Sequence, residues 1–127
     1  MKKNIEEICF KNIKKESCGF LMMYKEKIQV IECDNVSLNP ENSFEINYKD
    51  LIKYSISPRV VGVFHSHINT DEKFSKKDIK NSEELMLPFW VYSIKTKKHN
   101  VYIPENLTNK KNVKNFCEKI NTSRCKL

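Results

Sequence analysis

The chain has 127 residues and a net charge of +7, from 23 basic and 16 acidic side chains. This length predicts one domain, residues 1–127, that buries roughly two-thirds of its unfolded surface and needs no cross-links. No apolar run approaches the ~20 residues of a membrane span and no signal peptide is recognised, so we expect a soluble, cytoplasmic protein without a membrane partner.

Apolar spacing and turn residues divide the chain into alternating helices and strands. Helices are expected at residues 5–15, 48–54, 75–86 and 111–120. Strands are expected at residues 19–24, 28–33, 60–67, 89–94 and 100–103, with a short one at 44–46. This order favours an α+β fold in which helices flank a mixed β-sheet in a three-layer-like arrangement.

The sequence also predicts whether particular side chains point into the core or toward solvent. In the helix at 48–54 we expect Tyr48, Leu51 and Ile52 to point inward. The apolar face of the last helix consists of Val113, Phe116, Cys117 and Ile120. His99 has charged, turn-like neighbours, so we expect an exposed loop residue.

The five cysteines cannot all pair within the chain, and none lies in a Cys-x-x-Cys motif. We therefore expect reduced thiols, several of them in the core. Cys18 stands beside Gly19 and invites comparison with a nucleophile, but a small buried side chain at the start of a strand is the simpler interpretation.

Two histidines end the most apolar of the predicted strands. Side chains two residues apart on a strand share a face, so His65 and His67 project together while Ser66 points away. Two imidazoles placed in this way can bind one metal ion. Histidine pairs on strands are also often solvent-facing or locally hydrogen-bonded, and the pair alone is therefore a weak signal.

A helix start follows the second histidine after a seven-residue loop. Ser75 is a good N-cap, and Asp78 falls in the first helical turn. The loop can return Asp78 to the end of the strand as a third ligand, with the fourth position left for water. Ser-x-x-Asp is by itself an ordinary capping box, but together with the histidine pair it favours a mononuclear Zn²⁺ site for hydrolysis.

Hydrolysis of an amide also needs a group that transfers protons and is not a metal ligand. Glu16 is the candidate, because it lies where helical spacing changes to strand spacing. Without the histidines, a solvated charge at a helix end would be the preferred interpretation of Glu16.

Glu16, His65, His67, Ser75 and Asp78 together resemble the motif of the JAMM, or JAB/MPN, metalloprotease family, at the family's spacing. The flanking segments are also similar, and the likeness covers about residues 5–104. The resemblance implies the JAB/MPN fold, which is cytidine-deaminase-like. It also implies that His65, His67 and Asp78 bind Zn²⁺. In this family's scheme Glu16 would be general base and then general acid, and Ser75 would donate a hydrogen bond to the oxyanion.

Within the family, the small prokaryotic and phage members are the most similar. Residues 33–40, 44–46 and 85–90 resemble phage tail-tip assembly proteins of the K type, which implies a tail or other assembly partner in the host cytoplasm. The family usually has proline after the second histidine, where this chain has Ile68. The segment from Asp78 to Pro88 is too short for the ubiquitin-gripping insertions of eukaryotic members.

The leading hypothesis is a zinc-dependent metallopeptidase or isopeptidase that hydrolyses an amide bond in a protein or peptide through a metal-activated water. The alternative is a non-catalytic JAB/MPN-fold assembly or scaffold module. A zinc deaminase would need His-x-Glu and Pro-Cys-x-x-Cys, which the chain lacks. A basic nucleic-acid-binding domain is a third reading, but the lysines are dispersed and not interleaved with aromatics, so a nucleic-acid partner is not expected.

Overall fold

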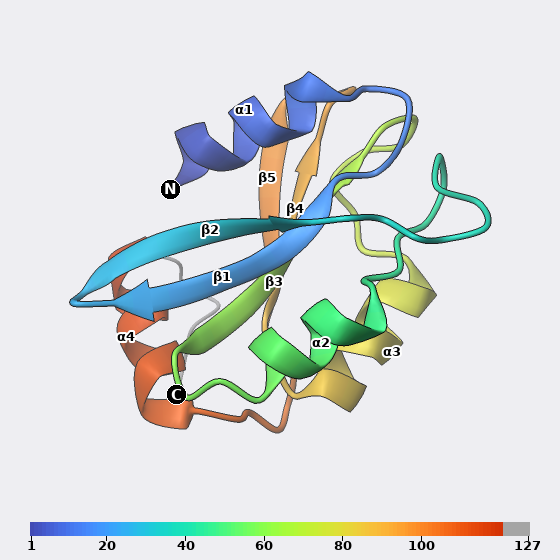
Figure 1. Cartoon of the computed structure of the whole chain (residues 1–127). Helices are drawn as coiled ribbons and strands as arrows, with labels where there is room; N and C mark the ends of the chain where they lie inside the picture. Colours follow the sequence, from blue (N-terminus) through green and yellow to red (C-terminus); the bar gives the residue numbers. More distant parts are fainter. Residues whose placement is uncertain (121–127) are drawn as a thin grey trace.

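The computed structural model describes residues 1–120 and contains a five-stranded β-sheet with helices on both faces (Figure 1). The helices are α1 (Lys2–Lys11), α2 (Tyr48–Ser55), α3 (Lys76–Leu85) and α4 (Lys110–Ile120). The strands are β1 (Cys18–Tyr24), β2 (Lys27–Cys33), β3 (Val60–His67), β4 (Phe89–Ser93) and β5 (Lys98–Tyr102). Their order is β2-β1-β3-β4-β5, with β3 and β4 parallel and the other neighbours antiparallel, so the predicted mixed sheet and α+β fold are confirmed.

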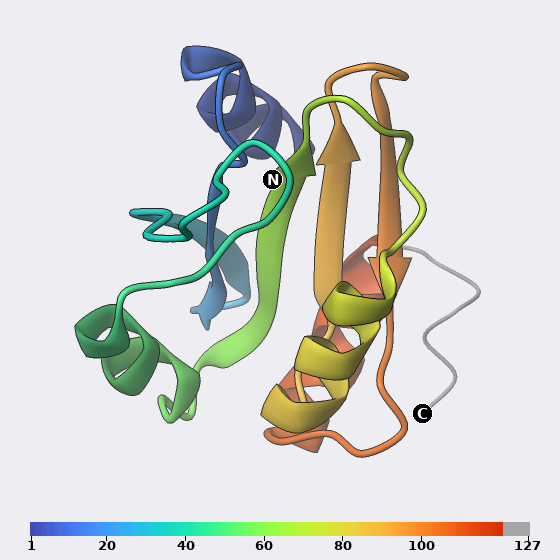
Figure 2. The same cartoon turned by 90° about the vertical axis from the view of Figure 1, so that its right-hand side faces the viewer.

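Two apolar cores lie on opposite faces of the sheet. On one face, Ile5 of α1 and Phe116 of α4 pack with Phe64 of β3. On the other face, α2 and α3 cover a core that includes Phe20 and Val63. Figure 2 shows α3 in front of β4 and β5, with α4 behind them. The sheet is therefore the middle layer of three, as predicted.

The central strand β3 is buried along its whole length. Its pairing with β1 shifts register at Val61, which indicates a β-bulge. The extra residue places both Val60 and Val63 on the α2–α3 face, while Val61 and Phe64 belong to the core under α1 and α4. Regular alternation resumes after the bulge and puts His65 on the same face as Val63.

Most predicted elements are present, with changes at their ends. The first helix ends at Lys11 and not at residue 15, because the Asn12 side chain accepts a hydrogen bond from the Lys14 N–H and offers the backbone a turn. The short strand expected at 44–46 is a single bridge between Asn35 and Ile46. None of the helices within residues 1–120 has the length and apolar character of a membrane span.

The inner face of α2 differs from the prediction. Tyr48 and Ile52, both expected inward, are 74% and 44% exposed. Leu51 packs against the core as expected, and its partner on that face is Tyr54. Residues three apart lie on one side of a helix, so Leu51 and Tyr54 face the sheet together and turn Ile52 outward.

His99 is not the exposed loop residue that we expected. The turn between β4 and β5 is short, so His99 falls on β5 and is half-buried. Its Nδ1 accepts a hydrogen bond from Trp90 Nε1–H at 2.9 Å, and its Nε2 lies 2.8 Å from Glu6 Oε2. Because an indole nitrogen can only donate, Nε2 carries the ring proton and donates it to Glu6. His99 therefore ties α1 to the sheet.

Within residues 1–120 the four cysteines are buried, and three of them are free thiols as predicted. Cys9, Cys18 and Cys33 are free, whereas Cys117 is disulfide-bonded, so the prediction of a reduced thiol is wrong there. Cys125 lies outside the described residues. Burial raises the pKa of the Cys9 thiol to about 12 and also raises the pKa of Cys18. A buried, protonated thiol is a poor nucleophile, which supports the structural interpretation of Cys18.

Gly19 of β1 leaves no space for a side chain. A Cβ there would clash with the Ile31 carbonyl oxygen and lie 2.6 Å from the Phe64 ring. We expect Gly19→Ala to lower the free energy of unfolding by about 1–3 kcal/mol, because backbone must move to accommodate the methyl group. Gly62→Ala is the control, since its closest contact would be the Pro88 carbonyl oxygen at 3.1 Å. Urea unfolding of both variants tests this, and equal losses would contradict it.

Candidate functional site

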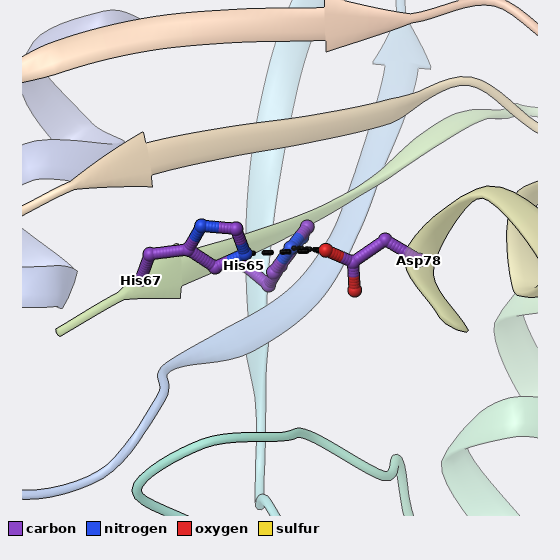
Figure 3. Close-up of side chains that lie close together, drawn as sticks. All are labelled: His65, His67 and Asp78. Atoms are coloured by element: carbon purple, nitrogen blue, oxygen red, sulfur yellow. Dashed lines mark hydrogen bonds and ion pairs between the residues drawn. The ribbon is translucent and has the colours of Figure 1, made fainter. Parts of the chain in front are cut away.

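His65, His67 and Asp78 converge at the end of β3 (Figure 3). Asp78 Oδ2 lies 3.2 Å from His65 Nε2 and 3.1 Å from His67 Nε2. The three ligand atoms lie within 4.8 Å of one another, and all three residues are buried. Ser66 points to the other face, where its Oγ accepts a hydrogen bond from the Ser17 N–H at 2.8 Å. The structure thus brings together the three residues proposed as ligands and separates Ser66 from them.

The start of α3 sets the position of Asp78. Ser75 Oγ accepts a hydrogen bond from the Asp78 N–H at 3.0 Å, and Asp78 Oδ2 accepts one from the Ser75 N–H at 3.1 Å. This reciprocal capping box satisfies two backbone donors that the helix itself leaves free. The positive end of the helix dipole also stabilises a carboxylate at this position. The helix cap therefore aims Asp78 at the histidines.

His67 is oriented by the loop that follows β3. Its Nδ1 lies 2.7 Å from the Asp71 carbonyl oxygen. A carbonyl can only accept, so Nδ1 carries a proton and Nε2 is the nitrogen that faces Asp78. Metal-binding histidines in proteins commonly have such a partner on the other ring nitrogen. Burial lowers the pKa of His67, but the hydrogen bonds to Asp78 and Asp71 outweigh it and raise the pKa above its usual value.

His65 is the most deeply buried of the three. Its ring stacks on Phe44 at 4.6 Å between centroids, and the Phe89 ring lies at 6.0 Å. Its Nδ1 is buried near the Trp90 backbone without a hydrogen bond of good geometry. Burial lowers the pKa of His65, although Asp78 opposes this shift. The apolar surroundings therefore favour the neutral imidazole, which is the form that binds a metal.

The donor set fits a divalent transition metal ion. Burial raises the pKa of Asp78, but hydrogen bonds from His65 and His67 dominate and hold the pKa well below its usual range. The site then offers one carboxylate oxygen and two imidazole nitrogens, the set found in zinc sites with an open fourth position. Mg²⁺ and Ca²⁺ prefer oxygen ligands throughout, so the donors favour Zn²⁺ or a similar ion.

Both residues proposed for catalysis line the same hollow as two of the proposed ligands, His67 and Asp78, while His65 is fully buried behind it. A pocket of about 430 Å³ is lined by Glu16, Ser75, His67 and Asp78. We call it the metal pocket. The pocket is formed by three segments that are distant in the sequence: the segment before β1, the end of β3 and the start of α3 (Figure 2). The tertiary fold therefore assembles this pocket.

Glu16 is fixed in place by its backbone. Its N–H donates to the Pro40 carbonyl oxygen at 2.7 Å, and its own carbonyl accepts a hydrogen bond from Asn35 Nδ2 at 2.9 Å. Its side chain is buried, which raises the pKa of Glu16 to about 8, with His67 lowering it and Asp78 raising it. A carboxyl group with a pKa near neutrality can both accept and donate a proton.

Sequence reasoning missed several residues of the metal pocket. They include Glu41 and Phe44 of the loop after β2, and Lys77 and Asn81 of α3. Lys77 precedes Asp78 and Asn81 follows it by one helical turn, so their positions could have been inferred from helical spacing. No local pattern indicated the two loop residues. Ile68, the departure from the family pattern, also lines the pocket.

The raised pKa of Glu16 should make the stability of the metal-free protein depend on pH. The folded pKa of about 8 exceeds the usual value of 4.5. The resulting stabilisation is therefore complete below pH 4.5 and is lost as the pH rises through 8. Glu16→Gln cannot ionise at this position. As the pH rises from 4.5 to 8, we therefore expect the free energy of unfolding of wild type to fall relative to that of this variant, by up to about 1.4 kcal/mol per pH unit.

Urea unfolding of the metal-free protein across this pH range is the measurement. Glu7→Gln is the control, because Glu7 is exposed on α1 and does not line this pocket. Parallel pH profiles for wild type and Glu16→Gln would contradict the burial of an ionisable Glu16.

Comparisons with known proteins agree with this fold. The model of a family described as prokaryotic homologs of the JAB domain matches residues 3–107. Among solved structures, the solution structure of protein DSY2949 from Desulfitobacterium hafniense is similar, with a TM-score of 0.55 and 20% identity over 78% of this chain and 75% of that chain. At this identity the likeness shows the fold alone, and no curated protein gives a significant match. Because the family match spans most of its length, this chain belongs to the family of prokaryotic JAB-domain proteins.

Proposed function

We propose that this protein is a zinc-dependent metallopeptidase or isopeptidase that hydrolyses an amide bond in a protein or peptide. The observation that carries this proposal is that two unlike groups meet at the metal pocket, which Glu16, His67 and Asp78 line. One is the buried set of His65, His67 and Asp78, which could hold a metal ion. The other is Glu16, a buried carboxyl group with a pKa of about 8. Membership of the JAB-domain family supports a hydrolase.

The ligands would supply the electrophilic part of the site. His65, His67 and Asp78 would hold Zn²⁺, which when bound polarises a carbonyl group and lowers the pKa of water. Asp78 is anionic and the buried His65 is neutral, so no carboxyl proton must leave before a cation binds, whereas the raised pKa of His67 means that a cation would displace a proton from its Nε2.

Glu16 would move the protons of the reaction. It accepts a proton from the attacking water and later delivers a proton to the leaving nitrogen, two steps that suit a pKa close to the working pH. Its burial keeps bulk water from levelling this pKa. The backbone hydrogen bonds of Glu16 to Pro40 and Asn35 hold it in position for both steps.

Ser75 would stabilise the charge that develops on the amide oxygen. Its Oγ accepts a hydrogen bond from the Asp78 N–H, which leaves the hydroxyl proton free for donation. Ser75 lines the metal pocket, so a substrate oxygen there is within its reach. A donor prepared in this way favours the transition state over the planar amide.

A role in phage tail assembly is the finer part of the proposal. The similarity to tail-tip assembly proteins involves residues 33–40, 44–46 and 85–90. In the structure, the first two segments belong to the loop that provides Phe44 to the metal pocket. This part of the likeness therefore lies where a substrate or an assembly partner would be recognised.

Metal binding should depend on Asp78. We expect the metal-free protein to bind about one Zn²⁺ per chain, and Asp78→Asn to bind it far more weakly, because even the hydrogen-bond partners of ligands contribute about 10–100-fold in affinity. Asp50→Asn is the matched control, since Asp50 lies in the first turn of α2. Elemental analysis and zinc titration measure both. Failure of the wild type to bind zinc would favour the assembly or scaffold module instead.

Glu16→Gln should separate catalysis from metal binding. We expect it to keep its zinc and lose about 10²–10⁴-fold in hydrolysis, the usual contribution of general acid–base catalysis. Glu41→Gln changes the other glutamate of the metal pocket, which is exposed, and should lose much less. Mass spectrometry of a mixed peptide library before and after incubation detects cleavage. Full activity of Glu16→Gln would refute this mechanism.

A further inference from the structure

A second hollow, of about 990 Å³, lies between α2 and α3. Val63 of β3 and Phe89 of β4 form its floor, with Leu51 of α2, Leu85 of α3 and Ile46 along its sides. We call these five residues and the space between them the apolar groove. Both helices pack on the same core, and Figure 2 shows α2 and α3 apart from each other, on the two sides of this hollow. Its volume lies at the upper end of the range for ligand sites in proteins, about 300–1,000 Å³.

The apolar groove is continuous with the metal pocket. Phe44, Lys77 and Asn81 line both hollows. The Phe44 ring stacks on His65 at 4.6 Å and lies 6.0 Å from the Phe89 ring. One aromatic side chain therefore contacts a proposed ligand on one side and the groove floor on the other. A chain that leaves the metal pocket in this direction passes directly over Phe44.

The spacing along β3 matches that of an extended peptide. Val63 and His65 are two residues apart on the same face, which corresponds to about 6.6 Å along the strand. An extended substrate has the same rise and also turns every second side chain to one side. If its amide lies at the metal pocket, the side chain two residues away lies over Val63 and Phe89. Val63 and Phe89 are 0% and 1% exposed, so the apolar surface open to that side chain comes mainly from the half-buried Leu51 and Leu85 beside them.

We propose that the apolar groove selects an extended peptide with a bulky aliphatic or aromatic side chain two residues from the amide that is cleaved. This inference rests on the proposed function, because it places the amide at the metal pocket. Burial of one such side chain is worth roughly ten- to hundredfold in binding. Polar and charged side chains at the same position gain no binding free energy from contact with apolar residues, and their desolvation weakens binding.

The test is a titration of the ¹⁵N-labelled, metal-free protein followed by NMR. Two heptapeptides serve as probes, Gly-Ser-Gly-Leu-Gly-Ser-Gly and the same sequence with glutamate at the centre. We expect the leucine peptide to shift the backbone amide signals of Leu51, Val63, Leu85 and Phe89 and to bind at least about tenfold more tightly than the glutamate peptide.

Two neighbouring residues of α2 provide matched variants. Leu51 lines the groove, whereas Ile52 is 44% exposed and does not line it. Leu51→Lys should weaken binding of the leucine peptide about tenfold or more, and Ile52→Lys should leave it unchanged. Leu51→Ala replaces Leu51→Lys if the NMR spectrum of the lysine variant shows that it does not fold, and it should weaken binding in the same direction.

Several outcomes would overturn the inference. Equal binding of the two peptides, signal shifts centred away from the groove, or equal effects of the two lysine variants would each do so. The same shifts on concentrating the protein alone would assign the groove to a second copy of this chain. Hydrolysis and zinc binding are measured separately. If the leucine peptide binds the groove but the protein neither binds zinc nor hydrolyses peptides, only the proposed function is refuted. If the protein hydrolyses peptides without preferring leucine, only the groove proposal is refuted.

Discussion

The site depends on the contacts of one oxygen atom, Oδ2 of Asp78. It accepts a hydrogen bond from the Ser75 N–H and faces the Nε2 atoms of His65 and His67, so it joins the start of α3 to the end of β3. Burial alone would make this carboxyl group neutral, and its partners keep it ionised. A buried anion opposite two imidazoles is stable only while protons or a cation lie between them. The site is thus built around positive charge.

The second carboxyl group lies in a different environment within the same pocket. Within residues 1–120 the Glu16 side chain has no comparable set of donors, so burial raises its pKa while that of Asp78 falls. Such a divergence separates a proton carrier from a permanent anion. Asn35 links the segment that contains Glu16 to the loop after β2. Its side chain holds the Glu16 carbonyl and also accepts from the Glu45 N–H, next to Phe44. One asparagine therefore supports both Glu16, the proposed proton carrier, and the wall that the metal pocket shares with the apolar groove.

Local physical rules account for what could be read from the sequence. Strand alternation places His65 and His67 on one face, and a serine three residues before an aspartate indicates the helix start at which Asp78 stands. The bounds of β3 follow from its apolar run and match the prediction, and the order of the helices and strands follows from their periodicity. Element ends were less accurate, as at Lys11, because side-chain turns such as that of Asn12 compete with the helix.

The sequence by itself therefore determined the orientation of the histidine pair, the cap that carries Asp78 and the α+β class, since each depends on neighbours along the chain. Only the tertiary structure decided which distant residues meet. Glu16 was selected because it lies where helical spacing changes to strand spacing, but its place in the metal pocket depends on contacts with the loop after β2. Phe44 stacks on His65, and His99 joins Trp90 to Glu6, through pairings that no local spacing encodes. Such contacts form only when the sheet and its helices pack together. Packing removes apolar surface from water and leaves buried polar groups to find hydrogen-bond partners among whatever residues the fold brings close.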